Sequence, residues 1–417
     1  MEGSQTSQEE EEDSSTSGIG SGFSNSSSSS SSSSGSSTTR NSQHHVLSIA
    51  PMIQWTDRHY RHLMRSLTKK TQLFTEMVMD DAIYFNRQDL EAFIGFDRDL
   101  EPPIALQIGG STPELCGEAA YCGEEYGYNE INLNAGCPSA KAKCKGFGAE
   151  LMLSPSLTRE ICHSMIRRTS QAEITVKCRL GVTGRDSYAE LLEFVEAVRS
   201  TGVRKMYLHA RKCELKGLSP AQNRTVPPLN YSWIHALVAQ YPDMKFTLNG
   251  GVLTLNEAEK HLHGRDEGDD NEGEGKDDDF YPRTTFRFNT STVSTTPPHG
   301  VMIGRGAYNN PWQFADADRR FFGCKNPGLS RREIVEEYIE YANKMNVTGM
   351  HGTSIPFLMK PLHNFFTGCP QAENKAYKRK LNGLLEQYCK TKSSFHDIIW
   401  EAIDNTISED ELDKRVL

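Results

Sequence analysis

The sequence predicts an α/β fold, a (β/α)8 TIM barrel followed by a C-terminal all-helical domain. Three observations lead to this prediction: the repeated order of strand and helix, the length of the repeated region, and a tail without strands. An acidic insert occupies residues 264–299. The repeated region without it, residues 46–263 and 300–324, comprises 243 residues, close to the ~250 typical of such barrels. We therefore expect the barrel at 46–324, interrupted by the insert at 264–299, and the helical domain at 325–417.

Eight short β-rich runs define the predicted strands. Their near-continuous apolar character is typical of strands buried on both faces of a parallel sheet, and each is followed by helical patterning. The clearest helix, at 187–202, places Leu191, Phe194 and Val198 on one stripe and has Gly202 as its stop signal. The predicted strands are 46–52, 71–78, 104–109, 130–136, 173–179, 205–210, 245–251 and 300–306.

The tail at 325–417 has helical patterning throughout. Ser330 and Glu333 have the spacing of a capping box at the start of a helix. Residues 375–392 hold six bases and one acid and keep apolar residues at helical spacing. This segment is therefore predicted to be a basic amphipathic helix.

The net charge of −9 comes from two segments. Residues 1–45 hold six acids, one base and a serine run, and residues 264–299 hold nine acids and four bases. Removing both leaves 40 acids and 41 bases, so the charge does not exclude a nucleic-acid partner. Both segments have little to bury and are predicted to be disordered. They join the barrel at the N-terminal ends of strands, and we expect them opposite the active mouth.

The N-terminal segment, the apolar runs and the cysteines bear on whether this is a membrane, organellar or metal-binding protein. No run of about 18 apolar residues exists, so we expect no membrane span. The acids at 9–13 contradict an organellar transit peptide, so we expect a cytoplasmic protein, with a plastid or mitochondrion as the alternative. Ten cysteines without a CxxC pair or a Cys/His cluster at zinc spacing predict no metal site.

Polar residues stand where the predicted strands end, which is where barrels of this class carry their active sites. We expect Gln107, Asn134, Lys177 and His209 to converge on one pocket, although each taken singly also fits an ordinary loop hydrogen bond. A lysine and a histidine among amide side chains suit a planar, anion-tending ring such as a flavin or a uracil.

Glycines follow the last two strands, in Asn249-Gly250-Gly251 and in Gly304-Arg305. Backbone N–H groups at such positions can cradle a phosphate, and Arg305 adds a permanent cation. A tight turn would explain one such pair equally well. Two pairs at these two strand ends favour a phosphate site.

Cys137 follows the fourth strand, between Gly136 and Pro138, in the predicted mouth. A thiol there can act as a general acid or a nucleophile, with an inert thiol as the alternative. No Ser/His/Asp set and no paired carboxylates accompany it in the sequence.

These strand ends resemble the tRNA-dihydrouridine synthases, and the segment at 209–231 resembles their A-type branch. The resemblance rests on APMxxxT (from Ala50), LQIGG, EINLNAGCPS, VKCRLG, LHAR, NGG and GRGAYNNPW. It implies an FMN-containing barrel with a helical tRNA-binding domain, reducing the C5–C6 bond of a D-loop uridine, at position 20 or its neighbour 20a. NADPH would re-reduce the flavin.

The resemblance also implies roles for individual residues. Cys137 would be the general acid, and Asn134, Arg179 and Arg224 would lie near the uridine or the tRNA. The residues that would hold FMN are Pro51, Met52, Gln107, Lys177, His209, Asn249, Gly250, Gly251, Gly304 and Arg305.

Recognition of a folded tRNA requires a basic surface beside the mouth. The helix at 375–392 is the best candidate, with a solvated helix face as the alternative. The family tends to carry arginines there, whereas this chain has Lys360, Lys375 and Lys378, which lose bidentate phosphate geometry. We expect a monomer. Two other functions stay open: an FMN barrel oxidoreductase acting on a small molecule, and a non-catalytic tRNA-binding protein.

Overall fold

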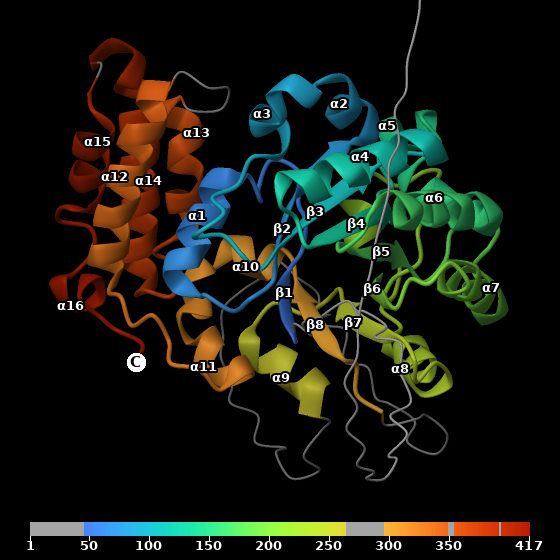
Figure 1. Cartoon of the computed structure of the whole chain (residues 1–417). Helices are drawn as coiled ribbons and strands as arrows, with labels where there is room; N and C mark the ends of the chain where they lie inside the picture. The colour runs from blue at the N-terminus through green and yellow to red at the C-terminus, as the bar shows by residue number, and fades with distance from the viewer. Residues whose placement is uncertain (1–45, 264–295, 349–353, 392) are drawn as a thin grey trace, which may run out of the picture. The chain divides into compact units, whose positions relative to one another are not determined.

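The computed structural model describes residues 46–263, 296–348, 354–391 and 393–417, and eight parallel strands form its centre. The predicted (β/α)8 barrel is confirmed (Figure 1). Neighbouring strands pair in the order β1-β8-β7-β6-β5-β4-β3-β2. The strands are β1 (Leu47–Ile49), β2 (Leu73–Met79), β3 (Ile104–Gly109), β4 (Glu130–Ala135), β5 (Glu173–Arg179), β6 (Lys205–His209), β7 (Lys245–Asn249) and β8 (Gly300–Ile303).

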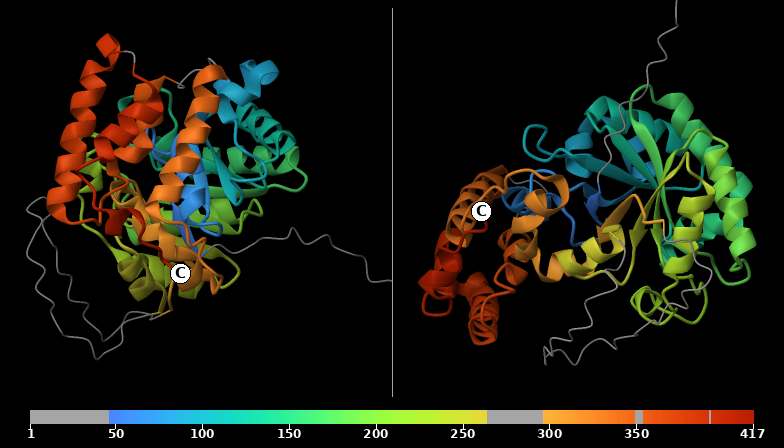
Figure 2. Two further views of the ribbon diagram at one scale, coloured as in Figure 1. Left: turned by 90° about the vertical axis from the view of Figure 1, so that its left-hand side faces the viewer. Right: turned by 90° about the horizontal axis from the view of Figure 1, so that it is seen from below.

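A short bridge between the first two strands completes the circle. Ser48 pairs with Gln72 in parallel, the Ile49 N–H donates to the Gln72 carbonyl oxygen at 2.9 Å, and the Gln72 N–H donates to the Leu47 carbonyl oxygen at 3.0 Å. Figure 2 shows the strands from below, surrounded by helices. Closure brings the C-terminal ends of all eight strands to one rim.

Helices cover the outside of the barrel because the apolar outer face of each strand must be buried. Ile131, Leu133 and Val176 are fully buried in this outer layer. A second, smaller apolar cluster fills one side of the interior: Ala50, Phe74, Ala105, Tyr207 and Met302. The helices of this part are α1 (Arg58–Leu67), α2 (Asp80–Phe85), α3 (Leu90–Ile94), α4 (Pro113–Tyr126), α5 (Ala140–Cys144), α6 (Pro155–Arg168), α7 (Tyr188–Arg199), α8 (Tyr231–Gln240), α9 (Leu255–His263), α10 (Arg305–Asn309) and α11 (Ala317–Phe322).

The C-terminal region is helical, as predicted. Its first helix begins with the expected reciprocal bonds, in which the Ser330 N–H donates to Glu333 at 2.8 Å and the Glu333 N–H donates to Ser330 Oγ at 3.3 Å. The helices are α12 (Arg331–Thr348), α13 (Ile355–Met359), α14 (Gln371–Thr391), α15 (Phe395–Ile403) and α16 (Glu409–Leu412). The boundary at 324/325 falls between α11 and α12 and stays a prediction as a domain boundary.

The helical region packs against α1 and the segment after β8. His59 Nδ1 lies 2.8 Å from the Tyr341 hydroxyl, and the Ser66 hydroxyl donates to Glu337 at 3.2 Å. The Arg331 guanidinium lies 4.0 Å from the centre of the Trp312 ring. Because α1 directly follows β1, these contacts tie the helical region to the rim of the barrel.

Residues 1–45 and 264–295 lie outside the described residues, so their predicted disorder is not tested. The chain enters β1 at Leu47, leaves α9 at His263 and re-enters β8 at Gly300, all on the N-terminal side of the strands. His299, which the sequence assigned to the insert, already lies against β7, where its N–H donates to the Phe246 carbonyl oxygen at 2.9 Å. Within the described parts of the chain, no helix combines the length and the apolar character of a membrane span.

Candidate active site

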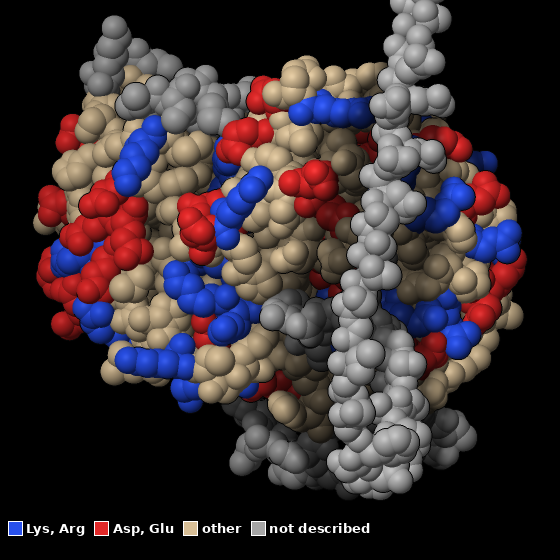
Figure 3. All heavy atoms as spheres, viewed as in Figure 1, with Lys and Arg blue, Asp and Glu red and all other residues tan. Residues whose placement is uncertain are grey.

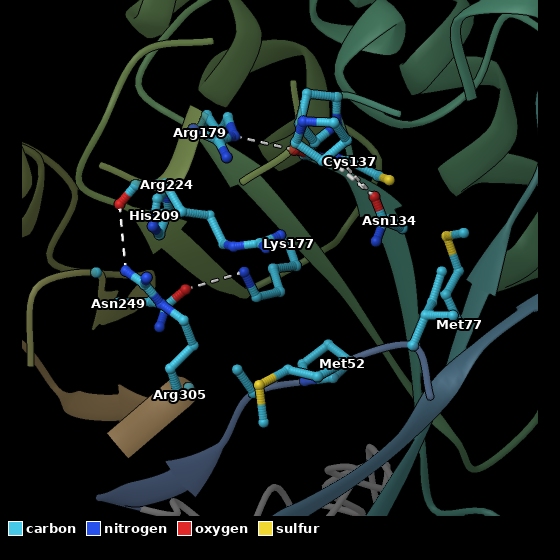
Figure 4. Close-up of a pocket in the computed structure, with 18 of the residues that line it drawn as sticks. Met52, Met77, Asn134, Cys137, Lys177, Arg179, His209, Arg224, Asn249 and Arg305 are labelled. Carbon is cyan, nitrogen blue, oxygen red and sulfur yellow. Dashed lines mark hydrogen bonds between the residues drawn. The ribbon is translucent and has the colours of Figure 1, made fainter. Parts of the chain in front are cut away.

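A cavity of about 460 Å³ opens at the C-terminal ends of the strands, within the size range of ligand sites. It brings together all the residues predicted for the catalytic, cofactor and uridine positions, which come from distant parts of the chain (Figure 4). Their chemical roles stay predictions. These lining residues are Pro51, Met52, Gln107, Asn134, Cys137, Lys177, Arg179, His209, Arg224, Asn249, Gly250, Gly251, Gly304 and Arg305.

Cys137 lies in the loop between β4 and α5 and is held there by backbone bonds. Its N–H donates to Asn134 Oδ1 at 3.0 Å, and its carbonyl oxygen accepts from the Ala149 N–H at 3.0 Å. The thiol lies 3.4 Å from the Ser139 hydroxyl and is partly exposed. A half-buried thiol with a fixed backbone is suited to proton donation into the cavity.

Lys177, near the end of β5, is the central cation of the cavity. Its Nζ donates to Asn249 Oδ1 at 3.0 Å, and the Asn249 amide donates in turn to the Met302 carbonyl oxygen at 2.8 Å. Burial, and then the neighbouring charge of Arg179, lower the pKa of Lys177 to about 8. None of the described residues that line the cavity is Asp or Glu. A negatively charged ligand would therefore find cations without competing carboxylates.

His209, at the end of β6, presents a neutral ring. Burial, followed by the nearby charges of Arg179 and Lys177, holds the pKa of His209 well below its usual range. Its Nδ1 is buried and has no hydrogen-bond partner among the described residues. A Cβ at Gly250 would lie 3.0 Å from His209 Nε2, and the positive φ of +103° there also favours glycine.

Arg179 and Arg305 in the cavity connect different loops. Arg179 is buried and donates to the carbonyl oxygens of Gly136, Lys212 and Asn223, each at 3.0 Å. It therefore holds the loop of Cys137 against the loop after β6. Arg305 donates to the Arg224 carbonyl oxygen at 3.4 Å and so links the last strand end to the same loop.

The three predicted tRNA-contacting lysines do not line the cavity. Lys375 is exposed on α14, while Lys378 on the same helix is half-buried and donates to Asn364 Oδ1 at 2.9 Å. Lys360 lies 4.1 Å from the centre of the Phe357 ring. Its charge also opposes the rise that burial causes in the pKa of Asp57, just before α1, so Lys360 lies near the rim.

The cavity also contains residues that the sequence reading missed. Met77 lines it because the register of β2 shifts between Phe74 and Met77, which breaks strict alternation and turns Met77 inward. Trp55, also in the lining, stacks on Tyr308 with ring centres 4.5 Å apart. Aromatic residues after the first strand were a signal in the sequence, whereas the bulge was not.

The cavity at the strand ends, with its cations and the partly exposed thiol of Cys137, places the protein among the (β/α)8-barrel enzymes. Comparison with known proteins gives the family. The family model described as dihydrouridine synthase matches residues 48–267 and 289–401. The chain belongs to the dihydrouridine synthase family, which confirms the resemblance seen in the sequence.

Curated relatives point to one branch of that family. A tRNA-dihydrouridine(20/20a) synthase of Synechocystis sp. is 36% identical over 336 residues, 81% of this chain and 88% of the relative. A protein of the same name from Pseudomonas putida is 40% identical over 303 residues, 73% of this chain and 79% of the relative. These names agree with the A-type branch. A solved 2-naphthoyl-CoA reductase aligns with 65% of this chain and 49% of its own at 9% identity and a TM-score of 0.44, too weak to indicate more.

No group of three or more His, Cys, Asp or Glu side chains is arranged to hold a metal ion in the described residues.

Proposed function

We propose that this protein is an FMN-dependent tRNA-dihydrouridine synthase that reduces the C5–C6 bond of a D-loop uridine with NADPH as reductant. The modified uridine is position 20, with 20a as a second site, in agreement with the names of the relatives. The observation that carries the proposal is the placement of Cys137 at a cavity lined by Lys177, His209 and Arg305.

The residues of the cavity fit FMN. The Nζ of Lys177 supplies a donor for a flavin ring, the neutral His209 ring lines the same cavity, and the turn at Gly250-Gly251 next to Arg305 suits the FMN phosphate. Both glycines have positive φ, at +103° and +78°, so their backbone approaches the cavity without a side chain. When bound and reduced by NADPH, FMN supplies the hydride for C6 of the uracil ring.

Cys137 completes the reduction in this proposal. The C5–C6 π bond breaks, a C–H bond forms at C6, and the Cys137 thiol gives its proton to C5. Asn134 orients the donor, because its side-chain oxygen accepts from the backbone N–H of Cys137. Neutral His209 and protonated Lys177 keep the surroundings polar without offering a competing carboxylate.

The tRNA reaches the mouth by extrusion of the target uridine, since a base inside a folded RNA is stacked. In this proposal exposed Lys375 and rim-side Lys360 neutralise phosphates, and half-buried Lys378 supports α14 through Asn364. Figure 3 shows acidic side chains over α12 and α16, where Arg332 pairs with Glu409 and with Asp413. Phosphates would be repelled from that side.

The proposal includes three further points. The protein acts as a monomer. It works in the cytoplasm, with a plastid or mitochondrion as the alternative compartment. The segments 1–45 and 264–299 are dispensable for the chemistry, so their joint deletion leaves activity in place.

The test is a dihydrouridine assay on unmodified tRNA with NADPH. We expect purified protein to be yellow, to release flavin on denaturation and to form dihydrouridine, with formation lowered by about 10²–10⁴-fold in Cys137→Ala. The matched control is Cys324→Ala, which removes a half-buried thiol outside the cavity. Protein without flavin would contradict both the proposed enzyme and the alternative small-molecule reductase. Flavoprotein without dihydrouridine formation would favour the latter.

A further inference from the structure

A column of buried polar side chains runs through the barrel below the mouth. Glu130, Asn132 and Asn134 alternate along β4, so their side chains point to the same, inner side of the strand. Glu130 is 5% exposed and Asn132 is fully buried. Barrel interiors are usually filled by branched apolar residues, which makes a polar column at this position unusual.

The lower half of the column begins at a carboxylate. The Thr175 hydroxyl donates to Glu130 Oε1 at 2.9 Å, and Asn132 Nδ2 donates to Thr175 Oγ1 at 2.8 Å. Gln107 Nε2 then donates to Asn132 Oδ1 at 2.8 Å. In-register pairing of Gln107 with Asn132 and of Asn132 with Thr175 on three neighbouring strands makes these bonds possible.

The upper half of the column ends at the loop of Cys137. Asn134 Nδ2 donates to Gln107 Oε1 at 2.8 Å. Asn134 Oδ1 accepts from the N–H of Gly136 at 3.1 Å and of Cys137 at 3.0 Å. One continuous chain of hydrogen bonds thus connects Glu130 with the backbone of Cys137, over about 13 Å of strand.

The two ends of the column impose the same direction on every bond. A carboxylate can only accept and a peptide N–H can only donate, whereas an amide side chain can be turned either way. Because Thr175 must donate to Glu130, its oxygen is left to accept from Asn132. The Asn132 oxygen then accepts from Gln107, and the Gln107 oxygen accepts from Asn134. Asn134 is thereby left with its oxygen, not its NH₂ group, facing the Cys137 loop.

The anion at the base is stabilised by its own partners. Lys205 Nζ lies 2.7 Å from Glu130 Oε2, and the Tyr207 hydroxyl donates to Glu130 Oε1 at 2.8 Å. The charge of Glu130 is therefore balanced inside the barrel, and its carboxylate oxygen is the acceptor at the base of the column.

We propose that Glu130, Thr175 and Asn132 are positioning residues for Cys137: through a one-way chain of hydrogen bonds they fix the orientation of Asn134 and hence the loop that carries the thiol. The catalytic meaning of this chain rests on the proposed function. The positioning is a property of the ligand-free protein, so it is tested without tRNA, NADPH or turnover.

The test compares Thr175→Val with two other variants in the full-length protein. Thr175→Val keeps the shape of the side chain but removes the hydroxyl and leaves Asn132 Nδ2 without its acceptor. Thr175→Ser restores the hydroxyl. Thr247→Val is the matched control, because Thr247 is also buried in the sheet but its hydroxyl has no partner among the described residues.

Two readouts report on the loop. Hydrogen–deuterium exchange measures the backbone of 135–140, and iodoacetamide labelling measures the Cys137 thiol, with half-buried Cys324 as the internal reference. We expect Thr175→Val to accelerate both at the Cys137 loop by about fivefold, the effect of losing one buried hydrogen bond, with Cys324 unchanged. Thr175→Ser and Thr247→Val should behave like the unchanged protein.

The proposal would be overturned if folded Thr175→Val protected the Cys137 loop from exchange and labelling as well as the unchanged protein does. It would also be overturned if Thr247→Val accelerated exchange and labelling of that loop equally. If Thr175→Val does not fold, Glu130→Gln takes its place: the loss of the acceptor-only end should loosen the same loop, and an unchanged loop would again overturn it. Failure of the proposed function would appear separately, as an absence of dihydrouridine formation by the unchanged protein, and leaves these readouts intact.

Discussion

The pKa values of two buried lysines at opposite ends of the barrel are shifted in opposite directions. Lys205 begins β6 and has carboxylates at 2.7 Å (Glu130) and 3.6 Å (Glu173). Burial lowers its pKa, but the two carboxylates outweigh that effect and raise it overall. Lys177 lies near the end of β5, bonds to the neutral amide of Asn249, and has its pKa lowered to about 8 by burial.

The difference separates a structural end of the barrel from a functional one. Charges at the base are balanced within the protein, so that end is complete when the chain folds. Lys177 at the mouth has no carboxylate partner among the described lining residues, which costs stability and keeps its charge available for an anionic ligand.

Lys205→Met should have the largest effect on stability. It leaves the Glu130 carboxylate buried without its counter-ion, and loss of one partner of a buried pair costs about 3–5 kcal/mol. Denaturant unfolding of the flavin-free protein measures this change. The double variant Lys205→Met/Glu130→Gln should recover much of the loss. A loss below about 1 kcal/mol in the single variant would remove the contrast between the two ends.

Lys177→Met should affect ligand binding rather than stability. It removes a buried cation that has no carboxylate partner in the described lining, so the unfolding free energy of the flavin-free protein should not fall. A hydrogen bond to a charged group contributes about 1.5–3 kcal/mol, so FMN should bind about 10–100-fold more weakly. Equilibrium titration with FMN measures the affinity. Destabilisation as large as that of Lys205→Met would contradict the assignment.

The stability of the flavin-free protein should rise with pH between about 8 and 10.5. The folded pKa of Lys177 is about 8 and its ordinary value is 10.5, so the unfolded chain binds more protons in this window. The penalty for burying the charged amine is fully present below pH 8 and is relieved as the pH rises. The gain should reach at most about 3 kcal/mol. Comparison with Lys177→Met isolates the contribution of Lys177. Equal slopes of unfolding free energy against pH in the two proteins would refute the prediction.

Lys375→Ala should have the smallest effect. This lysine is exposed on α14, so its removal should weaken tRNA binding only a few-fold and lower the salt dependence by about one ion. Lys414→Ala is the control, because Lys414 pairs with Glu411 at 3.2 Å on the acidic side of the helical region. Binding curves at several salt concentrations measure both. Equal effects of the two variants would place the tRNA elsewhere.

Much of the fold and the cavity could be predicted because strand ends are local in sequence. Gln107, Asn134, Lys177 and His209 each follow a recognisable apolar run, and parallel strands in a closed barrel must bring such ends to one rim. Met77 could not be predicted in this way, since the register shift in β2 depends on pairing with β3.

The order of strands and helices, the chemistry available at each strand end and the family resemblance could all be read from the amino-acid sequence, because they depend on local patterns and motifs. Which buried charged groups have a partner of opposite charge depends on the tertiary structure. Lys177 and Lys205 are both lysines of β-strands, and only the neighbouring strands give one a carboxylate and the other an amide. The column from Glu130 to Cys137 likewise exists only across strands, because hydrogen bonds between side chains depend on register and closure.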